Sequence, residues 1–219
     1  MKGAPSMDGA WVDRLERRIG FLAAPDLPRF LTGMTVLVGA LALLKPEFLG
    51  VLTLDPDAVR HGQVWRLLSF MAIPAVLPQD LFSTLWLGLW VWFLFGCLKT
   101  LEQVWGEFKL TVFLFLAAMS TAAAALWTGT ATGNGMPILA CFLALTRVDP
   151  ERIVLIYFIP VKMRWLANLA WLWLGLQLAT GHAFQRAMAL SVIATYLLFF
   201  WEGHRRELET AWRRRGGPR

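Results

Sequence analysis

Groups that bind metals or form disulfides are scarce in this sequence, which has 2 cysteines and 3 histidines among 219 residues. Cys97 and Cys141 lie in apolar segments without metal-ligand spacing, so we interpret both as buried small side chains. We therefore expect no metal and no cofactor. The first 29 residues are polar and charged and contain no apolar run before Phe30, so we also expect no cleavable signal peptide.

Charged side chains are missing from six apolar segments, and this absence counts against ion-coupled transport, which usually leaves an ionisable group in the membrane. The segments are Phe30–Leu44, Leu81–Leu98, Leu110–Thr128, Gly135–Leu145, Trp165–Thr180 and Ala187–Trp201. Only the second and third reach the range of about 17–25 residues of a straight span, so the others must be buried among neighbours or lie in thinned bilayer. A chain with fewer spans and several re-entrant segments is the alternative.

Apolar residues make up 57% of the chain, with 12 Trp and 15 Phe and a mean hydropathy of +0.54, which excludes a soluble globular domain and predicts an all-α integral membrane protein. With six spans and an inside N-terminus, seventeen of the 21 Lys and Arg residues fall in inside segments. The positive-inside rule therefore favours six spans with both termini cytoplasmic. Since the basic residues flank spans rather than form one face, we expect no nucleic-acid partner.

The chain divides into three parts: residues 1–29, a membrane domain over 30–201, and a basic cytoplasmic tail over 202–219. The first part is predicted to hold an amphipathic helix on the inner leaflet. Its apolar and basic faces are formed by Trp11, Leu15 and Ile19 and by Arg14, Arg17 and Arg18.

Two connections are irregular. The first outer loop, Lys45–Asp80, contains an amphipathic part, Trp65–Val76, that Pro74 and Pro78 interrupt, so we expect an interfacial helix or hairpin too short to span. The second is Ile153–Pro160, which is rich in β-branched and aromatic residues and too short for a helical crossing, so we expect an extended segment at the cytoplasmic face.

Three motifs resemble those of the rhomboid superfamily, which contains the rhomboid proteases and the derlins. "GQVWRLLSF" resembles their Trp-Arg signature, "LKTLEQVWGEFKLTVFLFLA" their Leu-Glu…Trp-Gly segment, and "IPVKMRWLA" a stretch before the fifth helix of bacterial members. The motifs follow in the family's order over about half of the chain. The family-signature residues are Gly62, Trp65, Arg66, Leu101, Glu102, Trp105, Gly106, Asn134, Pro160, Lys162 and Trp165.

The resemblance implies a rhomboid-like bundle of six transmembrane helices with an interfacial first outer loop, and a catalytic Ser-His pair between the fourth and sixth helices. This chain departs from that chemistry, because no serine occurs between Ser120 and Ser191. Gly135 or Thr132 stands where the nucleophile would be, and His182 is the histidine nearest to the family's base. The oxyanion-stabilising His and Asn of the second helix are also replaced, with Gln79 and Ser83 as the closest match.

Simpler roles are expected for the polar residues near that position. We interpret His182 as a solvated loop histidine, because no nucleophile is identifiable for it, and Thr132 as part of a polar turn before the fourth helix. Asn134 fits either an N-cap or a hydrogen bond to the outer loop, and we favour the cap.

Glu102, at the inner end of the second helix, is expected to accept hydrogen bonds from the backbone or a basic neighbour and to fix the following turn. Trp105 and Trp165 are expected to anchor at the water–lipid boundary. Arg66 is expected to donate several hydrogen bonds to loop carbonyls and so attach the outer loop to the bundle. The small residues of Ala117–Ala125 predict that the third helix is central.

The leading hypothesis is a bacterial inner-membrane pseudoprotease of the rhomboid-like type, which binds transmembrane clients in the lipid bilayer without cleaving them. An active intramembrane protease that uses Thr132 and His182 is the first alternative. A small-molecule transporter with a polar cavity lined by Asn134, Asn168 and Gln177 is the second.

Overall fold

The computed structural model describes residues 10–77, 79–156 and 159–214. Each of the six apolar segments lies within a helix, as the sequence predicts. These helices are α2 (Leu27–Leu44), α6 (Leu81–Trp105), α7 (Glu107–Thr128), α8 (Gly135–Val148), α9 (Met163–Thr180) and α10 (Ala183–Arg214). Four of them, α2, α6, α7 and the first part of α10, are long and apolar enough to cross a membrane. The chain is thus a mostly helical membrane protein; α8 has only 14 residues, and α9 carries Asn168 and Gln177.

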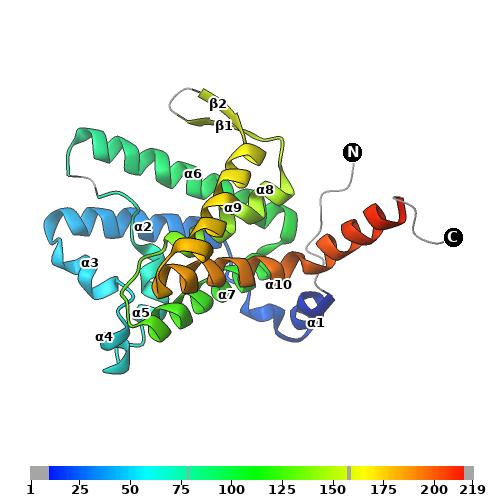
Figure 1. The fold of residues 1–219 in the computed structure, drawn as a ribbon. Helices are drawn as coiled ribbons and strands as arrows, with labels where there is room; N and C mark the ends of the chain where they lie inside the picture. Colours follow the sequence, from blue (N-terminus) through cyan, green and yellow to red (C-terminus); the bar gives the residue numbers. More distant parts are fainter. Residues whose placement is uncertain (1–9, 78, 157–158, 215–219) are drawn as a thin grey trace.

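The helices run back and forth between two ends of one bundle (Figure 1). At the end that we name the charged end, the last part of α6 meets the residues after α8, where Arg152 Nη1 donates to Thr100 Oγ1 over 2.8 Å. At the opposite end, named the loop end, the segment 45–80 meets residues 129–134, where Leu54 and Thr132 form an isolated antiparallel β-bridge. Successive helices among the six run in opposite directions between these ends.

The alanine-rich helix α7 is central, as predicted, and packs against α6, α8 and α10. Its alanines Ala117, Ala118, Ala122 and Ala125 are buried. Small side chains let helix backbones approach closely, and hydroxyls can then bond across the contact. Ser120 Oγ lies 2.9 Å from Thr195 Oγ1 of α10, which joins the two helices near their middles.

The described residues of segment 45–80 contain four short helical elements. They are α3 (Glu47–Leu52), α4 (Pro56–Arg60), α5 (Arg66–Ser69) and the 3₁₀ turn η2 (Phe70–Ala72). The helix or hairpin expected over Trp65–Val76 is helical, and only to Ala72, because the chain becomes extended at Ile73 before Pro74. A residue that precedes proline avoids the helical region. Pro78 lies outside the described residues.

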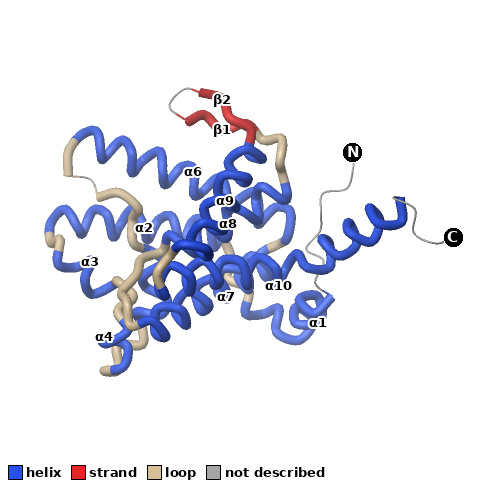
Figure 2. The backbone as a smooth tube through the Cα atoms, in the orientation of Figure 1, coloured by secondary structure: helices blue, strands red, loops and turns tan. Residues whose placement is uncertain are grey.

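The predicted extended segment is an antiparallel hairpin of β1 (Ile153–Ile156) and β2 (Ile159–Lys162), which pairs Ile153 with Lys162 (Figure 2). Pro160 stands opposite Leu155. The hairpin is anchored beside the start of α9, where Met163 N donates to Arg152 O over 2.8 Å. This hairpin is an addition to the all-α architecture expected from the sequence.

Glu151, before the hairpin, gives a test by pH. Lys162 Nζ donates to its carboxylate over 2.8 Å and Arg164 Nη1 over 2.9 Å. These contacts, with that of Lys162 the stronger, lower the pKa of Glu151 below its usual value of 4.5. The stabilisation of the hairpin base is therefore complete at neutral pH and is lost as the pH falls through the lowered pKa. NMR titration should show the amide of Ile153 shifting below pH 4.5 in the wild type and unchanged in Glu151→Gln; a midpoint above that value would contradict the prediction.

The predicted amphipathic helix is present as α1 (Ala10–Ile19), followed by the 3₁₀ turn η1 (Gly20–Leu22). Its apolar face packs on the bundle rather than facing an open leaflet: Val12 is fully buried and the Trp11 ring lies 5.3 Å from that of Phe199. Asp13 Oδ1 and Lys109 Nζ form an ion pair of 2.7 Å that holds α1 on α7. The position of this helix on the inner leaflet stays a prediction.

The basic tail does not begin as a separate segment, because α10 continues to Arg214. No proline interrupts residues 202–214, and pairs four residues apart stabilise the extension: Arg205 Nε lies 2.8 Å from Glu209 Oε1, and Arg206 Nη2 lies 3.7 Å from Glu202 Oε2. Residues 215–219 are outside the described part of the chain.

Gly181, between α9 and α10, has no room for a side chain. A Cβ there would collide with the carbonyl oxygen of Gln177 and approach Gln185 Cβ to 2.9 Å. We expect Gly181→Ala to lower the free energy of unfolding by about 1–2 kcal/mol. The matched control is Gly175→Ala in α9, whose added Cβ meets nothing within 4 Å. Equal melting temperatures of the two variants in detergent would contradict the prediction.

Candidate functional site at the loop end

Arg66 donates to carbonyl oxygens of the first outer loop, as the sequence predicts; these acceptors lie within segment 45–80, so the predicted attachment of the loop to the bundle by Arg66 stays a prediction. The side chain is buried, although it begins a helix in a loop. Its Nη1 donates to the carbonyl oxygens of Gly50 and of Thr53, the latter over 2.8 Å, and its Nε donates to Gln63 Oε1 over 2.7 Å. Three acceptors from two segments thus surround one guanidinium, which is the planar donor group best suited to such a fork.

The neighbours of Arg66 explain the rest of its motif. Gly62 has a φ of +93°, a conformation that residues with a side chain rarely adopt, and it ends the turn after α4 so that the chain reverses toward Trp65. Trp65 is half exposed. Ser69 Oγ adds a fourth tie by donating to Leu52 O over 3.1 Å.

Asn134 corrects one prediction. It occupies the N-cap position of α8, but its side chain makes no capping hydrogen bond. Its buried amide nitrogen donates instead to Met71 O over 3.0 Å and to Ile73 O over 2.6 Å. The reason is that the extended backbone at Ile73 leaves two carbonyls directed at the start of α8. Asn134 therefore joins the loop to the bundle and is not the N-cap that its position favoured.

The two weak catalytic candidates are not brought into contact. Thr132 uses its backbone for the β-bridge with Leu54, and its hydroxyl donates only over 3.5 Å to the adjacent Gly133 O. His182 is exposed, and its backbone N–H donates to Gln185 Oε1 over 2.9 Å. Within the part of the chain that the structure describes, no serine, threonine or cysteine is hydrogen-bonded to the His182 ring.

Ser83, the closest match to the oxyanion position, forms part of a capping box. Its backbone N–H donates to Asp80 Oδ1 over 2.7 Å, and its hydroxyl accepts from Asp80 N over 2.9 Å. The hydrogen bonds from Ser83 lower the pKa of Asp80. The pair therefore starts α6. The neighbouring Gln79 is exposed, with its backbone N–H bonded to Ser83 Oγ.

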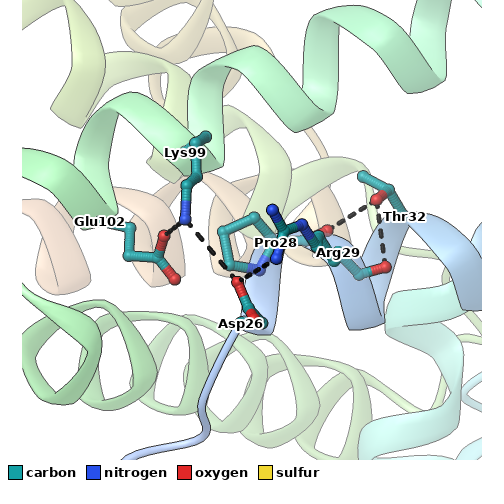
Figure 3. Close-up of polar contacts among 6 residues, drawn as sticks. All are labelled: Asp26, Pro28, Arg29, Thr32, Lys99 and Glu102. Carbon is teal, nitrogen blue, oxygen red and sulfur yellow. Dashed lines mark hydrogen bonds and ion pairs between the residues drawn. The ribbon is translucent and has the colours of Figure 1, made fainter.

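A second polar cluster lies at the charged end, where Glu102 accepts a hydrogen bond from Lys99 Nζ, as predicted (Figure 3). Lys99 Nζ also lies 3.8 Å from Asp26 Oδ1, which pairs with Arg29 Nη1 at 3.0 Å. The four side chains connect the end of α6 to the start of α2. Glu102 is buried, and its second carboxylate oxygen, Oε1, has no hydrogen-bond partner among the described residues.

The turn beside this cluster accounts for the second motif. Gly106 N donates to Glu102 O over 2.7 Å, and the φ of +87° at Gly106 ends α6. Leu101 is fully buried. Trp105 corrects a prediction: it is 6% exposed, with its ring 5.4 Å from Phe113 and 5.8 Å from Phe200, because α7 and α10 both pack against this turn. It is therefore a core residue and not a boundary anchor.

The third motif is exposed at Trp165 and buried at Met163. Trp165 is 58% exposed, and the Arg164 guanidinium lies 5.9 Å from its ring centroid. Its exposure is compatible with the predicted anchoring. Lys162 contacts Glu151 at the hairpin base. Both cysteines are buried, as predicted.

Several contacts were not foreseen from the sequence. The Asp13–Lys109 pair and the Arg152–Thr100 bond join segments far apart in the chain. A third contact lies within α10, where the Tyr196 hydroxyl is 3.2 Å from His204 Nε2. The spacing of eight residues did not indicate this contact in the sequence, because neighbours on a helix surface are three or four residues apart.

The chain matches no protein-family model, no curated protein and no solved structure in the comparisons made with it. The site must therefore be judged by its own geometry. At the loop end Arg66 donates within segment 45–80, Asp80 and Ser83 start α6, and Asn134 joins the segment to α8.

Proposed function

We propose that the protein is a rhomboid-like pseudoprotease: a multi-pass protein of the bacterial inner membrane that binds transmembrane client proteins and does not cleave them. The observation that carries the proposal is the contact of Asn134 with Met71 O and Ile73 O. In the resemblance this position lies beside the catalytic turn. In this chain Asn134 holds the outer loop, and Arg66 holds the loop's own segments together. Neither side chain can act as a nucleophile, so both roles are structural.

The six-span topology with both termini cytoplasmic is part of the proposal, and two observations support it. The six helices α2 and α6 to α10 alternate in direction, and the segments at the charged end are those that carry most of the Lys and Arg residues. A 14-residue α8 is about 21 Å long at a rise of about 1.5 Å per residue, short of a hydrocarbon core of about 30 Å. Because α8 packs against α6, α7, α9 and α10, it is covered by protein on most sides.

A client helix would bind beside α8, on the faces of α6 and α9 that flank it. Both helices pack on α8 or its neighbours and leave large apolar side chains exposed, among them Leu89 and Trp92 of α6 and Leu169 and Leu172 of α9. The bilayer beside a short helix becomes thinner, which weakens the lipid contacts of a client and favours its packing on protein.

Photocrosslinking from exposed positions tests this surface. A crosslinker at Leu89 or Leu172 should capture membrane proteins more strongly than one at Phe115, an equally exposed position on α7 that serves as the control. Equal capture from all three positions would contradict client binding at α6 and α9. If the purified protein cleaves a transmembrane substrate and His182→Ala abolishes this cleavage, the active-protease hypothesis would replace the pseudoprotease proposal.

A further inference from the structure

The hairpin of β1 and β2 stands outside the helix bundle. Its main contact with the helices is at the start of α9. In Figure 1 the two strands run from this base back in the direction of the loop end, and not onward beyond the charged end. The hairpin therefore lies on the flank of the bundle, at a level where the membrane-crossing helices are still present.

Both faces of this hairpin are apolar. Seven of the eight residues in its strands are apolar, and the register divides the eight between two faces. One face holds Val154, Ile156, Ile159 and Val161, and the other holds Ile153, Leu155, Pro160 and Lys162. An antiparallel sheet with one face in water alternates apolar with polar residues, and these strands do not. Since a two-stranded hairpin is at best marginally stable in water, apolar surroundings have to cover it.

The base of the hairpin is charged and suits the boundary between water and lipid. Glu151 accepts hydrogen bonds from Lys162 and from Arg164, and both basic side chains are about half exposed. Two basic groups with one carboxylate leave an excess of positive charge at this point. The exposed Trp165 follows directly, next to the Arg164 guanidinium. Exposed tryptophan and basic side chains are typical of the headgroup level of a membrane.

We infer that the hairpin inserts into the headgroup region of the leaflet at the charged end. Its base lies at the water boundary, and the far ends of the strands, Ile156 and Ile159, lie deeper among the lipids. A strand of four residues is about 13 Å long at about 3.3 Å per residue, which suits the depth of about 5–10 Å that interfacial elements reach. Deeper insertion would bring the unpaired outer edges of the strands into hydrocarbon, which excludes open sheet edges.

A second copy of the chain covers this hairpin less well. Pairing through an outer strand edge would satisfy backbone groups, but it would leave both apolar faces uncovered. Lipid surrounds the hairpin on both faces and also supplies polar headgroup atoms to its edges. The inference depends on the protein lying in a membrane and is independent of client binding.

Nitroxide labels on the full chain in liposomes of phosphatidylethanolamine and phosphatidylglycerol test the inference. The measurement is the accessibility of each label to oxygen, which concentrates in lipid, relative to a water-soluble nickel complex. This ratio should rise severalfold from Ile153→Cys to Ile156→Cys and stay below that of Trp92→Cys, an exposed position in the middle of α6. Thr210→Cys, in the charged part of α10, should report water. Both native cysteines are buried, so the unmodified chain is the labelling control.

Two results would overturn the inference. A ratio at position 156 equal to that at position 210 would place the hairpin in water. Low accessibility to both reagents at position 156, or magnetic coupling between the labels of two copies, would show that protein covers the hairpin.

A charge at the far end of the strands gives the second arm. With the label at position 153, Ile156→Lys should lower the accessibility ratio severalfold, because the hairpin leaves the lipid to keep the ammonium hydrated. Ile156→Leu is the matched control and should keep the ratio. Both variants should melt in detergent like the wild type, since the main contact of the hairpin is at its base. Equal ratios in the two variants would overturn the inference, as would a lower melting temperature of Ile156→Lys alone, which would show that the strands pack on the helices.

Discussion

Replacing Arg66 by alanine is expected to lower the free energy of unfolding by about 3 kcal/mol, because hydrogen bonds to a charged group each contribute about 1.5–3 kcal/mol and buried acceptors would lose their donor. The guanidinium is buried and serves Gly50 O, Thr53 O and Gln63 Oε1 at once. In the variant the first two carbonyls would remain without that donor, and α3 would lose its tie to α5. Thermal unfolding in detergent, followed by tryptophan fluorescence, measures the loss.

Arg60→Ala is the matched control for Arg66, since it removes an arginine from the same segment. Arg60 is exposed and pairs with Asp57 at 3.0 Å while donating to Leu126 O, so its loss should cost less than about 1 kcal/mol. Arg66→Lys should recover part of the stability, because an ammonium can serve one or two of the acceptors but not all three. If Arg66→Ala melts like Arg60→Ala, the loop is held by its apolar contacts and not by the guanidinium.

The positions of the helices could be predicted from apolar runs, but their ends could not be predicted from charge. The second run stops at Leu98 in the sequence because Lys99 and Glu102 are polar, yet α6 continues to Trp105. The helix ends where Gly106 takes a positive φ, a signal that the sequence contained. Similarly, α10 continues beyond Trp201 because ion pairs four residues apart replace apolar packing on its surface. A hydropathy boundary marks where burial ends, and the hydrogen-bonded helix extends past it.

The environment of a side chain could be predicted where the chemistry of that residue alone decides it. It could not be predicted where the packing of distant segments decides it. Arg66 has many donors and must find acceptors wherever it is buried, so its role followed from its chemistry, although Gly50 and Thr53 could not be named. Trp105 suits either a boundary or a core, and only the packing of α7 and α10 decides between them. The same limit applies to α1, whose amphipathic pattern predicts an apolar contact without saying whether lipid or protein supplies it.

The loop end connects stability with the proposed function. A client-binding surface beside α8 requires that the start of this short helix stays fixed, since α8 lacks the length to be held by the bilayer alone. Two polar ties provide that fixation: Arg66 orders segment 45–80, and Asn134 joins the ordered segment to α8. Loss of either tie should therefore weaken crosslinking of client proteins from both α6 and α9. This effect does not depend on a catalytic site.

Asn134→Asp distinguishes the two roles considered for this residue. Aspartate is among the best N-cap residues, so a capping role predicts unchanged or higher stability. The observed contacts predict the opposite: a carboxylate cannot donate to Met71 O or Ile73 O and would face both carbonyls inside a buried site. We expect a loss of about 3 kcal/mol, since a charge-bearing group would be left buried among acceptors. Thermal unfolding at neutral pH measures it.

Gln79→Glu provides the control for Asn134→Asp, because it exchanges an exposed amide at the same end of the bundle for a carboxylate and should melt like the wild type. The pH dependence gives a further check on the cause. If the loss comes from a buried carboxylate among carbonyls, acid should restore part of the stability, since the introduced side chain loses its charge on protonation and regains one donor. A capping role would give the reverse, because a protonated acid is a weaker acceptor for backbone N–H groups. Recovery at low pH in Asn134→Asp, absent from Gln79→Glu, would therefore assign the side chain to the loop carbonyls and not to the helix terminus.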